Sequence, residues 1–219
     1  MEEVLFKDRA DAAKQLIKKI PPTDPSSTIV LGIPRGGVPM AAQIADALHL
    51  PLDLLLIRKL TTTQNPEYAI GAVSLNRSWV DERPPVSDTD LNKQIEEGRQ
   101  VLRKRNAFYR KNRPFPSLHD KTVLLVDDGI ATGRTLLHGI EEVRSQQPKA
   151  IWVIVPVSSR EAASLIGPRV ERLICLYQPA PFIGVGRFYQ SFPPVEDEEV
   201  VKSIETKGEE GRNSNMFEA

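Results

Sequence analysis

Two adjacent carboxylates followed by a loop of glycine and hydroxyl residues have the types and spacing to bind a charged ligand. Asp127 and Asp128 directly follow the apolar run Val123–Val126, and Gly-Ile-Ala-Thr-Gly-Arg-Thr (residues 129–135) comes next. Loop amides and the N-terminus of a following helix favour an anion, because their N–H groups are unpaired and the helix dipole is positive there. Carboxylates beside a phosphate site are explained if they bind sugar hydroxyl groups or share a metal ion with the ligand. A phosphorylated sugar would supply both.

A second loop of this kind follows the apolar run Thr28–Ile33. It reads Pro-Arg-Gly-Gly (residues 34–37), and apolar residues at helical spacing follow it as far as Leu48. One interpretation is a tight turn that needs glycine for a positive φ angle. The other is a ligand loop, since ligands of open α/β sheets bind at the carboxyl ends of the strands.

A third apolar run, Leu52–Ile57, ends in the basic pair Arg58 and Lys59. The pair is either a solvated strand end or, at the same sheet edge, a contact for a charged ligand. A polar loop containing Glu67 follows, and its carboxylate is either a reacting group or a solvent-exposed side chain.

Apolar runs that each end in a polar loop before a helix predict an α/β fold with a doubly wound, mostly parallel sheet. We expect one domain over residues 1–206, with a helical insertion over 81–118. Ser87 or Asp88 can cap the insertion helix, which should run to about residue 112. The composition of residues 207–219 predicts a disordered tail.

The composition bears on the partners and the compartment of the protein. The 219 residues contain 29 Lys and Arg against 29 Asp and Glu, which disfavours a nucleic-acid partner, although the basic run 99–113 keeps that reading open. This run is interpreted first as a solvated helix face, and otherwise as a basic lid or a dimer arm. The single Cys175 gives no disulfide framework. No stretch is long enough to span a membrane and no signal-peptide apolar region is present, so we expect a cytoplasmic protein.

The run from Val123 to Thr135 resembles the phosphoribosyl-diphosphate (PRPP) motif of type I phosphoribosyltransferases. The resemblance implies that Asp127 and Asp128 hold the ribose 2′- and 3′-hydroxyl groups and contribute to Mg²⁺ binding, through water where they do not bind directly. Residues 34–37 are similar to the family's pyrophosphate loop, in which a cis peptide is implied at Arg35–Gly36. The implied substrate-binding residues are Arg35, Gly36, Gly37, Arg58, Lys59, Asp127, Asp128, Gly129, Ile130, Ala131, Thr132, Gly133, Arg134, Thr135 and Phe182.

The implied activity is transfer of the 5-phosphoribosyl group from PRPP to a nitrogen nucleophile, a nucleobase or related amine, with release of pyrophosphate and a requirement for Mg²⁺. Asp127, Asp128 and Glu67 would be the catalytic residues. The resemblance also implies a small hood over residues 177–195, in which Phe182 would stack on a base, and a homodimer is expected. Ala131 stands where hypoxanthine-type members carry an aspartate. The alternative is a non-catalytic regulatory protein of the same fold that senses PRPP. A further alternative is that the motif binds no ligand and is an ordinary strand–turn–helix with an acidic cap.

Overall fold

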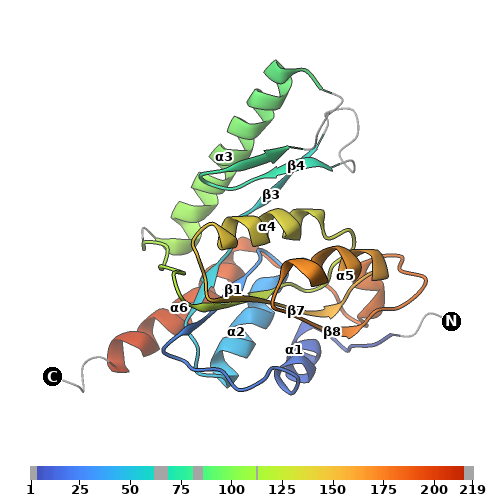
Figure 1. The fold of residues 1–219 in the computed structure, drawn as a ribbon. Helices are drawn as coiled ribbons and strands as arrows, with labels where there is room; N and C mark the ends of the chain where they lie inside the picture. Colours follow the sequence, from blue (N-terminus) through green and yellow to red (C-terminus); the bar gives the residue numbers. More distant parts are fainter. Residues whose placement is uncertain (1–3, 62–68, 81–85, 112, 215–219) are drawn as a thin grey trace.

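A five-stranded parallel sheet forms the centre of the molecule in the computed structural model, which describes residues 4–61, 69–80, 86–111 and 113–214 (Figure 1). The strands are β1 (Thr28–Gly32), β2 (Leu52–Leu54), β6 (Thr122–Val126), β7 (Ala150–Val157) and β8 (Arg172–Tyr177). Their order in the sheet is β2-β1-β6-β7-β8, and every neighbouring pair is parallel. The predicted fold class is confirmed.

Helices cover both faces of this sheet (Figure 1). Helices α1 (Arg9–Ile17) and α2 (Gly37–Ala47) pack on one face, and α4 (Arg134–Arg144) and α5 (Arg160–Ile166) pack on the other. Successive strand residues point to opposite faces. Val30 and Leu124 therefore join the core under α1 and α2, while Leu31 and Leu125 join the core under α4 and α5. Burial on both faces explains why these strands are apolar throughout.

The strand order reverses between β1 and β6. From β1 the chain moves outward to β2 on one side, and the later strands are added on the other side, from β6 to β8. In doubly wound sheets such a reversal leaves a crevice at the carboxyl ends of the two central strands, and ligands bind there. The Pro-Arg-Gly-Gly loop follows β1 and the acid pair follows β6, so both predicted loops meet at this point.

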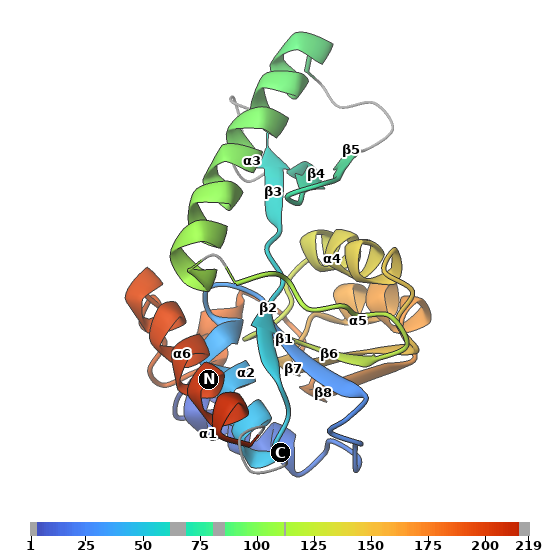
Figure 2. The ribbon, with the colours of Figure 1, turned by 90° about the vertical axis from the view of Figure 1, so that its left-hand side faces the viewer.

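An arm projects from the body of the molecule and consists of a second sheet and one long helix (Figure 2). The sheet is antiparallel and contains β3 (Arg58–Thr61), β4 (Ala69–Val73) and β5 (Ser78–Val80). The helix α3 (Asp88–Arg110) is about 35 Å long at 1.5 Å per residue. The Ser87 side chain caps it by accepting a hydrogen bond from the Asp90 N–H at 3.1 Å, so the predicted insertion helix is confirmed.

The foot of the arm is fixed by a buried arginine. Arg110 has an exposed fraction of 3%, and it donates hydrogen bonds to Asp53 Oδ1 at 2.7 Å and to the Leu54 carbonyl at 2.6 Å. Its guanidinium also lies over the Phe115 ring. These contacts join the end of α3 to the edge strand β2.

The chain after the sheet closes over the N-terminal segment. The 3₁₀ turns η1 (Gly167–Arg169) and η2 (Val185–Phe188) flank β8, and Phe6 forms a parallel bridge with Tyr189 in the predicted hood. The last helix, α6 (Asp197–Ser214), packs on α2 and α3. Composition predicted disorder from residue 207, but α6 continues to Ser214, because lengthening a helix already anchored by Val200 and Ile204 needs no new nucleation. No helix in the described ranges is long and apolar enough to cross a bilayer.

Candidate functional site

The acid pair stands at the carboxyl end of β6, where the β1–α2 loop packs directly against it. Asp127 donates its N–H to the Ile154 carbonyl at 3.3 Å, and the Asp128 N–H is bonded to Asp127 Oδ1 at 2.9 Å. A Cβ atom on Gly36 would collide with the Asp128 carboxylate, and one on Gly37 would collide with the backbone of Val126 and Asp127. The structure therefore brings both predicted ligand loops to the same sheet edge.

The loop after the acid pair is held by the end of β7. Ile130 forms a bridge to the neighbouring strand, because its N–H donates to the Val157 carbonyl at 2.9 Å and its carbonyl accepts from the Ser159 N–H at 3.0 Å. The Ser159 hydroxyl donates to the Ala131 carbonyl at 2.6 Å and also accepts from the Ala162 N–H at the start of α5. The Ile130 amide is thus already used within the protein, and an anion would be bound by the later amides of the loop.

The N-terminus of α4 offers such amides. Gly133 is the N-cap residue and has φ +73°, a left-handed conformation that favours glycine. Gly133 has no side chain with which to cap this helix end. The first N–H groups of α4 point along the helix axis without intrahelical partners, and the dipole adds positive potential. This geometry supports an anion site next to the two carboxylates, as the sequence predicted.

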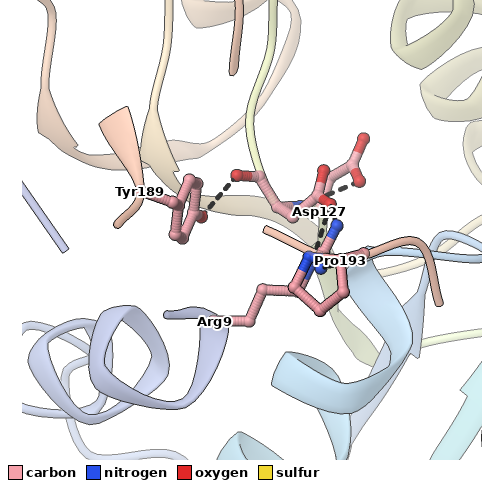
Figure 3. Close-up of polar contacts among 5 residues, drawn as sticks. Arg9, Asp127, Tyr189 and Pro193 are labelled. Atoms are coloured by element: carbon pink, nitrogen blue, oxygen red, sulfur yellow. Dashed lines mark hydrogen bonds and ion pairs between the residues drawn. The ribbon is translucent and has the colours of Figure 1, made fainter. Parts of the chain in front are cut away.

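Arg9, which the sequence did not single out, reaches the acid pair from the first turn of α1 (Figure 3). Its Nε and Nη2 both donate to Asp128 Oδ2, at 3.0 and 2.8 Å, and its Nη1 donates to the Pro193 carbonyl at 2.7 Å. The guanidinium lies 3.7 Å from the centroid of the Phe192 ring. On the other side, the Tyr189 hydroxyl donates to the Asp128 carbonyl at 2.7 Å. The local sequence around Arg9 gives no sign of this contact.

Burial sets the electrostatics of the acid pair. It raises the pKa of Asp127 well above the usual range, and the neighbouring Asp128 carboxylate adds to the rise. Burial also raises the pKa of Asp128, although the hydrogen bonds from Arg9 oppose this change. Burial and the charge of Asp128 raise the pKa of Tyr189, so its hydroxyl remains a donor. Burial thus disfavours the charged form of both carboxyl groups, and Arg9 is the cation that opposes this effect at Asp128.

Arg35, the cation of the predicted pyrophosphate loop, pairs with the start of α6. Its Nη1 lies 3.5 Å from Glu196 Oε2 and 3.8 Å from Asp197 Oδ1, and Asp197 also accepts a hydrogen bond from the Tyr109 hydroxyl. The cis peptide precedes Arg35 (Pro34–Arg35), so the prediction of a cis bond at Arg35–Gly36 was wrong by one residue. The Arg35–Gly36 bond lies within the first turn, where Gly36 is helical and the Arg35 carbonyl accepts from the Val38 N–H.

The position predicted for Arg58 and Lys59, at the end of a core strand, was wrong. The strand β2 ends at Leu54, and the two basic residues begin β3 in the arm, exposed beside α3. The apolar run is continuous because Leu55 packs in the core under α4, while Leu56 packs in the cluster shared by the arm and α6. One buried linker between two cores therefore has the same sequence pattern as one strand.

Two residues assigned to the acceptor base stay predictions. Phe182 is partly buried and its ring lies 5.2 Å from that of Phe188 in the hood. Glu67 lies outside the described residues.

The acid pair can supply only part of a metal site. Within the described ranges, no group of three or more His, Cys, Asp or Glu residues could hold a metal ion. Mg²⁺ commonly binds through one or two carboxylates and takes its other ligands from water and substrate phosphates. Two carboxylates beside an anion site fit that pattern.

A family model, the phosphoribosyl transferase domain, matches residues 3–170, which are more than half of the chain. The chain belongs to the phosphoribosyl transferase domain family. The matched residues contain α1 to α5 and hence Arg9, the β1–α2 loop, the arm and the acid pair.

Curated relatives agree with this membership, and solved structures are similar to the chain. A protein of Mycobacterium tuberculosis strain H37Rv, named "Putative phosphoribosyl transferase Rv0571c", is 33% identical over 206 residues that cover 92% of this chain and 46% of that protein. The chain thus spans about half the length of the curated relatives it matches. The crystal structure of TT1426 from Thermus thermophilus is 35% identical, covers 91% of this chain and 97% of that one, and has a TM-score of 0.77. The AQ2163 protein from Aquifex aeolicus, 13% identical with a TM-score of 0.50 over 83% of this chain and 85% of that one, shows the same fold.

Proposed function

We propose that the protein transfers the 5-phosphoribosyl group of PRPP to a nitrogen atom of a small acceptor and releases pyrophosphate. The observation that carries the proposal is the meeting of three features at the switch point of the sheet. These features are a desolvated acid pair, the N-terminus of α4, where the N-cap residue Gly133 offers no capping side chain, and the glycine loop after β1. Membership of the phosphoribosyl transferase domain family supports it.

Each part of PRPP has a chemically matched partner at this site. The 5′-phosphate would bind the amides and hydroxyl groups of the loop up to Thr135 and the start of α4. The ribose hydroxyl groups would donate to Asp127 and Asp128, which are acceptors at the end of a rigid strand. The diphosphate would lie at residues 34–37, where Arg35 supplies positive charge.

The chemistry in such a site is mainly positioning and charge stabilisation. As pyrophosphate leaves, carbon 1 of the ribose gains positive charge, and the acid pair lies on the sugar side where negative potential stabilises that charge. Mg²⁺, held by Asp127 and Asp128 directly or through water, would neutralise charge on the diphosphate when it is bound. Arg35 would exchange Glu196 and Asp197 for the diphosphate, so that the cation is oriented before the ligand arrives.

The acceptor is a nucleobase or related amine in this proposal, with Phe182 stacking on it and Glu67 acting near its reacting nitrogen. The place of Ala131 in the loop argues against a hypoxanthine-type acceptor.

The test is release of pyrophosphate from PRPP and Mg²⁺ over a panel of nucleobases and amines, combined with calorimetry of PRPP binding. The proposal expects acceptor-dependent release, which Asp127→Asn and Asp128→Asn abolish. Absence of PRPP binding by the wild-type protein would overturn it. PRPP binding without transfer to any acceptor would favour the sensor hypothesis instead.

A further inference from the structure

Arg9 connects three parts of the molecule that are distant in sequence. It begins α1, bonds to Asp128 after β6, and bonds to Pro193 in the hood (Figure 3). Its side chain has an exposed fraction of 12% and that of Asp128 has 15%, so the ion pair is largely shielded from water. Shielded, charge-assisted bonds with two donors are among the stronger contacts in proteins.

Arg9 contacts one of the two carboxylate oxygens of Asp128. Both Arg9 donors reach the same oxygen, Oδ2, and this is also the Asp128 atom nearest to the position of a Cβ atom on Gly36. The carboxyl group is therefore clamped between the guanidinium and the β1–α2 loop through one oxygen. The Tyr189 hydroxyl, bonded to the Asp128 carbonyl, fixes the backbone of the same residue.

The N-terminal segment that carries Arg9 is hydrogen-bonded to the hood. The N–H groups of Leu5 and Phe6 donate to the Phe188 carbonyl, and the Gln190 N–H donates back to the Phe6 carbonyl. The Phe192 ring covers the guanidinium and packs at 4.7 Å from the Tyr189 ring. The hood thus holds the Arg9 side chain in one position, which a residue that only neutralised charge would not require.

We propose that Arg9 is a positioning residue for the sugar: it holds Asp128 by Oδ2 and ties it to the hood, which leaves Oδ1 for a ribose hydroxyl group. This inference rests on the proposed function, because it assigns Asp128 to the sugar. Arg9 does not touch the ligand's phosphate groups in this arrangement. Its loss therefore weakens recognition of the sugar and leaves recognition of a phosphate ester unchanged.

Two phosphate monoesters separate these contributions. Ribose 5-phosphate has the ring hydroxyl groups, and propyl phosphate has none. The ratio of their dissociation constants, measured by NMR titration, reports the sugar contribution alone. We expect Arg9→Ala to reduce the preference for ribose 5-phosphate about tenfold, in the range of a lost charge-assisted hydrogen bond, with propyl phosphate unaffected. Arg9→Lys keeps the charge but cannot reach Asp128 and Pro193 together, so it should restore the preference only in part.

Arg172→Ala is the matched control. Arg172 also stacks on an aromatic ring, that of Trp152 at 4.9 Å, but it lies at the opposite edge of the sheet, where β8 begins. We expect the control to leave the ratio unchanged. The role of Arg9 is overturned if the wild-type protein prefers ribose 5-phosphate and Arg9→Ala retains that preference, or if propyl phosphate binding weakens as well. If Arg9→Ala does not fold, an unchanged ratio in Arg9→Lys overturns it. A wild-type protein without any preference would overturn the proposed sugar site and this role with it.

Discussion

Asp128 Oδ2 lies closer than 3.0 Å to the position that a Cβ atom on Gly36 would occupy, a separation that real Cβ atoms essentially never show. The two residues follow neighbouring strands, β1 and β6. The backbone of Gly36 is helical, with φ −62° and ψ −33°, so any residue could adopt it. Glycine is needed at this position because a carboxylate approaches it, and not because the turn requires a positive φ angle.

Gly36→Ala should therefore damage the site without damaging the fold. The added methyl group would push the Asp128 carboxyl group from its place between Gly36 and Arg9. We expect PRPP binding in the presence of Mg²⁺ to weaken at least about tenfold by calorimetry, because a charge-assisted hydrogen bond is misplaced. Gly167→Ala is the control, since a Cβ atom there meets nothing within 4 Å. Equal PRPP affinity in the two variants would contradict the prediction.

Asp128→Asn tests the acid pair directly. The substitution keeps the size of the side chain and removes the negative charge that the ribose hydroxyl group and Arg9 both use. We expect PRPP affinity to fall roughly ten- to hundredfold, the range for one such bond, with a folded protein by circular dichroism. Asp120→Asn, an exposed aspartate in the turn before β6, serves as the control. If Asp128→Asn bound PRPP with wild-type affinity, the motif would be an ordinary strand–turn–helix and not a PRPP site.

Local patterns predicted the parts of the molecule that depend on neighbours in sequence. The apolar run Val123–Val126 is a strand buried on both faces, and the glycine loop after it leads into α4 as expected. Ser87 caps α3, because a short side-chain acceptor before a helical run is a local signal.

Contacts between residues distant in sequence could not be predicted from local patterns. Nothing in the local sequence shows that Arg9 contacts Asp128, since that contact depends on how α1 packs on the sheet and how the hood packs on the N-terminal segment. The run Leu52–Ile57 was misread for a related reason. Burial makes a run apolar whether it forms one strand or, as here, a linker between two cores, and sequence reports the burial alone.

Glu171, at the sheet edge opposite to the candidate site, should make the free energy of unfolding depend on pH. Burial acts to raise its pKa, but hydrogen bonds from Arg144 at 2.9 Å and from the Ile151 N–H at 2.6 Å outweigh this, so the pKa is lowered from its ordinary value of 4.5. A carboxyl group with a lowered folded-state pKa stabilises the protein above its unfolded-state pKa and loses that effect as the pH falls through the folded-state value. The free energy of unfolding should therefore be larger for wild type than for Glu171→Gln at pH 7. This difference should shrink as the pH falls below 4.5, and a constant difference down to pH 3 would contradict the assignment.

Replacing Arg110, at the foot of the arm, should cause a large loss of stability. Its partner Asp53 has a side chain only 14% exposed, so Arg110→Ala would leave a buried carboxylate unpaired as well as remove the bond to the Leu54 carbonyl. Breaking such a pair typically costs about 3–5 kcal/mol in the free energy of unfolding. Arg103→Ala is the control, because its ion pair with Glu96 is exposed and should contribute less than about 1 kcal/mol.

The two tryptophans allow urea unfolding to be followed separately in the arm and in the body. Trp79 lies in β5 of the arm and Trp152 in β7 of the central sheet. In a Trp152→Phe background, the remaining tryptophan fluorescence reports the arm. We expect Arg110→Ala to lower the unfolding midpoint seen by Trp79 far more than Arg103→Ala does, because α3 loses its attachment to β2. Equal midpoints would show that the apolar contacts between the arm and the body hold the arm in place without this ion pair.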